Sequence, residues 1–137
     1  MGTVEIYPPS PNWFQASCCA VQQGVLAYAA RERIVLMDVA TGHVVRMLGS
    51  DCGPTAARAA AVALTEHGGR LIAACAHENG AVRLWDATAG TVLLCGTAAA
   101  DTPLTSCALC TTTRAENAVV VVGDAHGRLS LWFYADT

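Results

Sequence analysis

The apolar residues of the chain fall into short runs, and glycine, proline or charged residues separate one run from the next. Short apolar runs bounded by turn residues are typical of β-strands. Within most runs the residues are almost continuously apolar, which is typical of a sheet packed on both faces. The pattern therefore predicts an all-β fold. We expect strands over residues 16–21, 25–30, 34–38, 44–48, 56–64, 71–76, 81–85, 91–95, 104–111, 118–122 and 128–134.

Residues 78–94 show the basic unit most clearly. The segment opens with an Asn-Gly pair, a strong hairpin signal because both residues tolerate the positive φ that a two-residue primed turn needs. A strand ending in Trp85-Asp86 follows, then a turn that closes at Gly90, then a second short strand. The segment therefore reads as turn, strand, turn and strand.

This unit recurs along the chain. Residues 33–45 repeat the order of strand, Asp, turn and strand, and residues 123–132 repeat the polar turn and the strand that ends in Trp. Asp38 and Asp86 are 48 positions apart, and Trp85 and Trp132 are 47 positions apart. A regular spacing of this size is the signature of a repeat architecture.

The strand that ends in Trp85-Asp86, with the turn and short strand after it, resembles the end of a WD repeat, which is one four-stranded blade of a β-propeller. The resemblance implies a partial β-propeller with two full blades and most of a third. We expect an N-terminal Pro-rich segment with an aromatic pair at 1–15, and blades at 16–49, 55–97 and 103–137. Because a seven-bladed ring needs roughly 280 residues, we expect a fragment of a longer protein, a truncated gene model, or a piece completed by other chains.

Residues 56–64 are the one ambiguous run. They are rich in alanine, the best helix former, so local propensity favours a helix. The repeat requires the first strand of the second blade at this place. We predict a strand, because tertiary packing commonly overrides propensity.

The composition narrows the class of protein. The apolar content of 53% argues against disorder, and the net charge of −3 gives no general attraction for nucleic acid. All eight basic residues are Arg, which pairs with phosphate and stacks on bases better than Lys. The number of cysteines is odd and the sequence shows no secretion signal, which predicts a protein of the cytoplasm and nucleus. No apolar run is long enough to span a membrane, so we expect no membrane contact.

The candidate catalytic and metal-binding groups are weak. Cys107 and Cys110 form a Cys-x-x-Cys, but no second pair accompanies them, and in a strand they would point to opposite faces. WD repeats often carry a His that bonds a turn Asp, and this chain has no such His in recognisable form. Asp124 and Glu78 lie near the position of the turn carboxylate, so we expect structural roles for them. The sequence predicts no enzyme, no metal site, no cofactor and no small-molecule substrate.

The N-terminal segment carries a more specific resemblance. The string Pro-Pro-Ser-Pro-Asn-Trp-Phe at residues 8–14, followed by residues 25–31, is similar to the N-terminus of the Gemin-five (gem-associated protein five) family. The resemblance implies the start of a tandem WD-repeat domain that recognises the Sm site and cap of small nuclear RNAs. It also implies a role in snRNP assembly and mRNA splicing, with the protein subunits of the SMN complex as partners.

The same resemblance implies the site residues. In that family the aromatic pair at Trp13 and Phe14 and the Arg at Arg31 contribute to RNA contacts. Phe14 stands where the family usually has Tyr, which keeps a stacking face and removes a hydroxyl group. The physical account agrees, because single-stranded RNA is read by stacking bases on aromatic rings with Arg supplying phosphate or planar contacts.

The alternative is a WD-repeat scaffold that binds only proteins, with the aromatic pair of Trp13 and Phe14 buried in blade packing. The acidic net charge and the absence of Lys favour this alternative. Exposure of the two rings would distinguish the two hypotheses.

Overall fold

The computed structural model describes residues 9, 11–12, 17–49, 57–98, 102–111 and 117–135. These residues form eleven β-strands and no helix, so the described part of the chain has no helix that could cross a membrane. The strands are β1 (Cys19–Gln22), β2 (Val25–Ala30), β3 (Arg33–Asp38), β4 (Val44–Leu48), β5 (Ala59–His67), β6 (Arg70–His77), β7 (Ala81–Asp86), β8 (Thr91–Thr97), β9 (Leu104–Thr111), β10 (Asn117–Asp124) and β11 (Leu129–Ala135).

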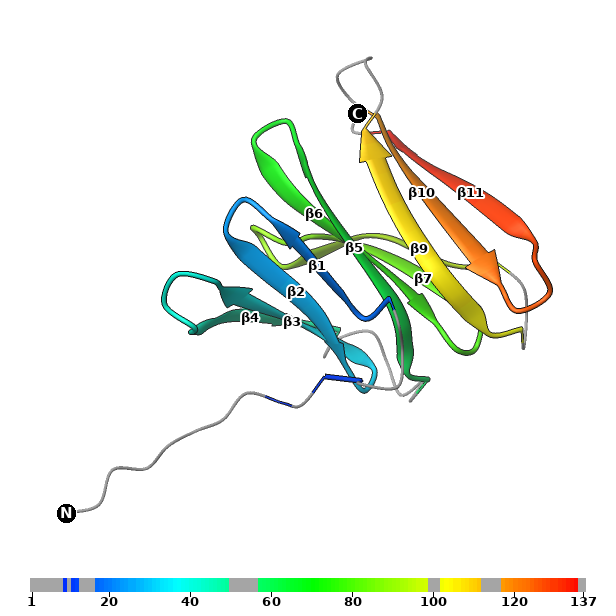
Figure 1. The fold of residues 1–137 in the computed structure, drawn as a ribbon. Helices are drawn as coiled ribbons and strands as arrows, with labels where there is room; N and C mark the ends of the chain where they lie inside the picture. The colour runs from blue at the N-terminus through cyan, green and yellow to red at the C-terminus, as the bar shows by residue number, and fades with distance from the viewer. Residues whose placement is uncertain are drawn as a thin grey trace.

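The strands form three antiparallel sheets in which each strand pairs with its neighbour in the sequence. The first sheet is β1-β2-β3-β4, the second is β5-β6-β7-β8, and the third is β9-β10-β11. Figure 1 shows the three twisted sheets side by side, with the second between the other two. The all-β fold, a partial β-propeller with two full blades and most of a third, is confirmed.

The alanine-rich run is a strand, as the repeat required. β5 extends from Ala59 to His67, and its first six residues are buried. It contacts β1 and β2 of the first sheet and β9 of the third, so it lies where all three sheets approach one another. Alanine suits this position because a small side chain allows neighbouring backbones to come close. Packing between sheets therefore outweighs the helix propensity of the run.

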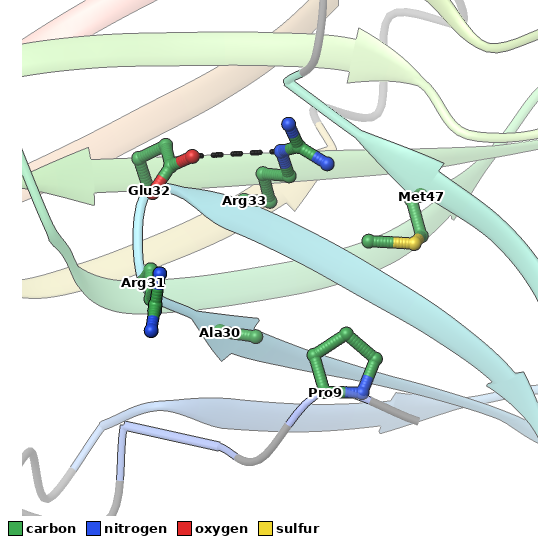
Figure 2. A pocket seen from close by; sticks show the side chains of 6 residues that line it. All are labelled: Pro9, Ala30, Arg31, Glu32, Arg33 and Met47. Atoms are coloured by element: carbon green, nitrogen blue, oxygen red, sulfur yellow. Dashed lines mark ion pairs between the residues drawn. The ribbon is translucent and has the colours of Figure 1, made fainter. Parts of the chain in front are cut away.

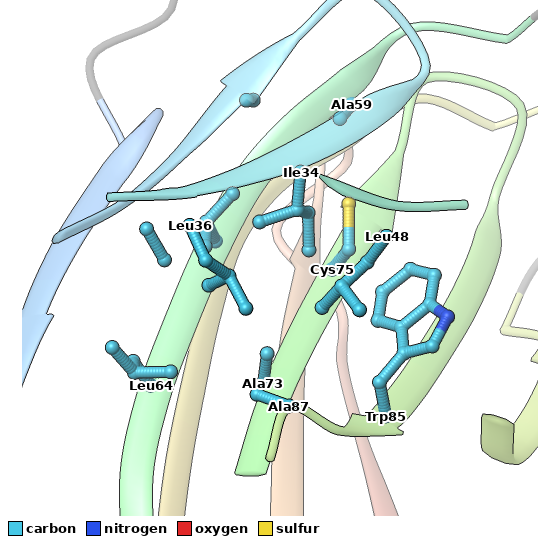
Figure 3. Close-up of a cluster of buried hydrophobic side chains, with 12 residues drawn as sticks. Ile34, Leu36, Leu48, Ala59, Leu64, Ala73, Cys75, Trp85 and Ala87 are labelled. Carbon is cyan, nitrogen blue, oxygen red and sulfur yellow. The ribbon is translucent and has the colours of Figure 1, made fainter. Parts of the chain in front are cut away.

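Two apolar clusters hold the sheets together. One lies between the first and second sheets and includes Ile34, Leu36 and Trp85 (Figure 3). The other lies between the second and third sheets and includes Leu84 and Val120. Because each face of the second sheet contributes to one cluster, this sheet is covered on both sides, as its continuous apolar runs predict.

The repeated turns have the same backbone geometry. The N–H of Gly42 donates to the Asp38 carbonyl at 2.8 Å, and the N–H of Gly90 donates to the Asp86 carbonyl at 2.7 Å. The carboxylate of each Asp also accepts a bond from a backbone N–H in its own turn. Both glycines have positive φ, near 71° and 79°. The 48-residue repeat in the sequence is therefore a repeat of structure.

The hairpin at Asn79-Gly80 forms, but its strands are joined by a three-residue connection instead of the predicted two-residue primed turn. Residues 78–80 connect β6 to β7, and only Gly80 has positive φ. The N–H of Gly80 donates to the His77 carbonyl at 3.1 Å, and the Asn79 side chain accepts from the N–H of Ala81. A three-residue connection needs one left-handed residue, so Asn79 is not required to adopt positive φ.

Candidate nucleic-acid interface

Arg31 lies in the turn between β2 and β3, directly after the second strand, and its side chain is exposed. Its φ is 55°, which is unusual for a residue with a Cβ atom. The Arg31 carbonyl accepts a 2.7 Å bond from the N–H of Ala59, the first residue of β5. The turn that carries the guanidinium is thus joined to the innermost strand of the second sheet.

Asn12 is the buried partner of this turn. Its side-chain Oδ1 accepts from the N–H of Arg31 at 2.8 Å, and its Nδ2 donates to the carbonyls of Arg31 and Ala59 at 2.9 and 3.1 Å. The N–H of Asn12 donates to the Ala29 carbonyl at 2.8 Å. The side chain uses both of its donors and one of its acceptor positions, so its burial is well compensated.

A pocket of about 440 Å³ opens beside Arg31. Figure 2 shows residues of its lining, among them Arg31 and Glu32 of the turn, Arg33 at the start of β3 and Met47 of β4. Arg33 Nε lies 3.5 Å from a Glu32 carboxylate oxygen, and both side chains are partly exposed. Arg31, Glu32 and Arg33 together carry a net positive charge on side chains that are at least partly exposed, which suits contact with phosphate.

Pro9 is the lining residue that comes from the N-terminal segment. Its carbonyl accepts a 2.8 Å bond from the hydroxyl of Tyr28, a buried residue of β2. Burial raises the pKa of Tyr28, so its hydroxyl stays protonated and can donate this bond. Pro9 and Asn12 thus connect the N-terminal segment to the first sheet at two points.

The sequence-predicted site is described in part. Trp13 and Phe14 lie outside the described residues, whereas Arg31 lies next to Asn12, the residue that immediately precedes Trp13. The structure thereby brings Arg31 and Asn12 together, although 19 positions separate them in the sequence. Sequence reasoning missed the role of Asn12. The only available signal was its place in the Pro-rich string, because an isolated Asn predicts no particular partner.

The cysteines that the structure describes give no second candidate site. Cys107 packs against the cluster between the second and third sheets while Cys110 is exposed, so the predicted opposite orientation in β9 is confirmed. Burial raises the pKa of Cys107 to about 12 and raises that of Cys75 well above its usual value. Protonated thiols are poor nucleophiles and poor metal ligands. In the described part of the chain, no three His, Cys, Asp or Glu side chains cluster as a metal site.

The turn carboxylate of the third sheet has a structural role. Asp124 accepts bonds from the N–H groups of His126 and Arg128 at 2.9 and 3.0 Å, and from Arg128 Nε at 2.8 Å. The corresponding turn of the second sheet begins at His77, which is buried and donates from Nδ1 to the Ala57 carbonyl. Burial, the largest effect, lowers the pKa of His77. The Asp124 contacts close the turn between β10 and β11, whereas the His77 bond joins the end of β6 to the segment before β5.

Comparisons with known proteins agree with the fold. No protein-family model matches the chain. The chain is 33% identical to Gem-associated protein 5 of Homo sapiens over an alignment of 95 residues, which spans 63% of this chain and 6% of that protein. A crystal structure of Chaetomium thermophilum Raptor, a WD-repeat protein, superposes with a TM-score of 0.62 and 14% identity. That match covers 87% of this chain and 12% of Raptor.

The predicted resemblance to Gem-associated protein 5 is therefore confirmed, and the fold is that of a partial β-propeller. The likeness to Raptor supports the fold alone, because the sequence identity is low. The chain spans only a small share of the length of both proteins.

Proposed function

We propose that this chain is a non-catalytic RNA-binding WD-repeat protein that recognises single-stranded small nuclear RNA. The similarity to Gem-associated protein 5 supports this class of function. It also supports a role in snRNP assembly with protein partners of the SMN complex. The proposed location is the cytoplasm and nucleus. Trp13 and Phe14 stack on bases, and Arg31 contacts a phosphate or the edge of a base.

The observation that carries the proposal is the position of Arg31. Its exposed side chain belongs to a turn whose backbone is bonded to Asn12, the residue that precedes Trp13 in the sequence. Aromatic faces beside an arginine are the usual means of holding splayed bases of single-stranded RNA. The adjacent pocket beside Pro9 and Met47 offers room for a nucleotide.

The binding test uses the whole chain and a short fluorescein-labelled single-stranded RNA that contains an Sm site. We expect Trp13→Ala and Phe14→Ala each to weaken binding roughly tenfold or more, because stacking contributes about 1–3 kcal/mol per base. Arg31→Asn removes the charge and retains a residue that tolerates positive φ. This variant should lower the slope of log affinity against log salt by about one.

Arg46→Gln is the matched control, because it removes one positive charge from β4 without touching the turn at Arg31. Its affinity should stay close to that of the unmodified chain. Equal losses for Arg31→Asn and Arg46→Gln would mean that RNA senses only net charge. No change in affinity for Trp13→Ala and Phe14→Ala would remove the stacking site from the proposal.

A protein-binding scaffold is the second candidate. The observation that favours it is the outward face of the third sheet, where Leu129, Leu131 and Phe133 of β11 are exposed together. A contiguous apolar surface of this kind is typical of protein contacts. If the labelled RNA does not bind the chain at any salt concentration while this face mediates association, the scaffold function is the better account.

A further inference from the structure

The outward face of the third sheet presents a row of exposed apolar side chains. Leu129, Leu131 and Phe133 of β11 are each more than half exposed. Val121 of β10 lies directly opposite Leu131, and Ala108 of β9 lies opposite Val121, so all three strands contribute to this face. None of these five residues is charged. The face therefore has the composition of a buried surface, although in the described part of the chain it is open.

The same positions are covered in the other two sheets. Leu36 and Leu84 occupy the place of Leu131 in the repeat, and all but a trace of their surface is buried. Val82, which corresponds to Leu129, is also fully buried. In each case the next sheet supplies the cover, since β5 lies against β1 and β2, and β9 lies against β5 and β6. The open face of the third sheet is thus one half of a contact that the chain makes twice.

The first sheet carries the other half of this contact on its outward face. A row of three apolar residues crosses one face of each sheet at equivalent positions of the repeat. The rows are Val21–Leu26–Met37, Leu64–Ala73–Trp85 and Leu109–Val120–Trp132. The second and third rows pack into the two clusters between the sheets. The first row lies on the face turned away from the second sheet, and its Val21 is 62% exposed.

Pro9 occupies only one part of this outward face. Its carbonyl is bonded to the hydroxyl of Tyr28, and it lines the pocket beside Ala30 at the far end of β2. Val21 and Leu26 are paired with each other nearer the turn that joins β1 to β2. The Pro9 contact therefore lies away from Val21, the most exposed residue of the row.

We propose that two copies of this chain associate head to tail, with the outward face of the third sheet of each copy packed against the outward face of the first sheet of the other. A contact between two different faces closes into a ring when the rotation returns to its start. Two copies with three sheets each bring six sheets, which lies within the range of roughly 4–8 blades in β-propellers. The second contact then forms within a complex that the first has already joined. This association is independent of the proposed RNA-binding function.

The experiment is sedimentation velocity on the 137-residue chain and on variants that each change one face. Leu131→Glu alters the third sheet and Val21→Glu alters the first. Both side chains are already more than half exposed, so neither change should disturb the fold, which circular dichroism checks. We expect the unmodified chain to form dimers, and each variant alone to associate at least tenfold more weakly.

Mixing the two variants is the decisive step. In an equimolar mixture the Val21→Glu chain supplies an intact third sheet, and the Leu131→Glu chain supplies an intact first sheet. One of the two contacts can then form between unlike copies, so dimers should reappear. A dimer in which two third sheets face each other would behave differently, because Val21→Glu alone would still dimerise and mixing would restore nothing.

Val45→Glu is the matched control. Val45 is 63% exposed, against 62% for Val21, but it lies on β4 at the outer edge of the first sheet. Contacts between sheets inside the chain are made chiefly by the first two strands of each sheet, so this variant should dimerise like the unmodified chain. A reducing agent is present throughout, so that the exposed Cys19 and Cys110 do not link copies covalently.

Three results would overturn the proposal. A chain that stays monomeric at every concentration would show that a second copy does not cover the open face of the third sheet. Loss of dimers in both variants without recovery on mixing would exclude the head-to-tail arrangement. Assemblies that grow beyond two copies as concentration rises would show that the ring does not close. Each of these results leaves the RNA-binding function to its own test.

Discussion

The second and third sheets contain the same repeated motif, but the leucine at one position of the motif is buried in the second sheet and exposed in the third. Leu84 of β7 and Leu131 of β11 both precede the tryptophan that ends the repeated motif. Leu84 is fully buried against the third sheet, whereas Leu131 is 56% exposed. Leu36 of the first sheet, at the same place in the repeat, is 2% exposed because the second sheet covers it.

The aromatic positions show the complementary rule. Trp85 packs against the first sheet and Trp132 packs against the second, so each tryptophan faces the sheet that precedes it in the chain. The neighbouring leucine faces the sheet that follows. Strand alternation fixes this division, but the presence of a following sheet decides whether the leucine is buried. A hydrophobic position in a repeat therefore contributes to stability only where its neighbour exists.

The largest expected effect comes from truncating the two leucines. Leu84→Ala should lower the free energy of unfolding by about 2–5 kcal/mol, because it leaves a cavity between two packed sheets. Leu131→Ala should change it by no more than about 0.5 kcal/mol, because the side chain is already in water. Urea unfolding followed by circular dichroism measures both values. Equal losses at the two positions would contradict the comparison.

A smaller effect is expected from the turn of the third sheet under acid. The backbone N–H of Arg128 is the largest cause that lowers the pKa of Asp124 below its usual value of 3.8. The Arg128 side chain and the N–H of His126 add to it, and together they outweigh the opposing effect of burial. The stabilisation by the carboxylate is therefore complete above pH 3.8 and is lost as the pH falls below that value toward the lower folded-state pKa.

Asp124→Asn tests this linkage. The variant should be less stable than the unmodified chain at pH 7, and the difference should shrink at pH 3, measured as urea midpoints at the two pH values. Arg128→Gln keeps the backbone donor and removes only the guanidinium. Its urea midpoint at pH 7 should therefore lie between those of Asp124→Asn and the unmodified chain. A constant difference between pH 7 and pH 3 would show that the charge on Asp124 does not contribute.

Substitutions at the exposed apolar residues of β11 in the third sheet should have the smallest effect on stability and a clear effect on association. Phe133 is 70% exposed beside Leu131, so Leu131→Ser with Phe133→Ser should leave the urea midpoint almost unchanged. The double variant should associate less than the unmodified chain as concentration rises, measured by sedimentation velocity. Val45→Ser, at an exposed position of β4, is the control and should not reduce association.

Most of the fold could be predicted from the sequence. The repeat, the turn at Asp86 and the strands that flank it depend on spacing and on residues that favour turns, both of which are local. The candidate site could be predicted only in part. Arg31 was predicted as a site residue from a family resemblance. Nothing in the local sequence indicated that the Asn12 side chain would bond to the Arg31 backbone, 19 positions away.

The sequence by itself determined which residues alternate between the two faces of each strand, and where the chain turns back. These features follow from the two-residue period of a strand and from the conformations that Gly, Asn and Asp tolerate. Only the tertiary structure decided that the alanine-rich run is β5, that Leu84 is buried while Leu131 is not, and that Asn12 meets Arg31. Each of these depends on contacts with residues that are distant in the sequence. The conformational preference of a short segment does not include such contacts.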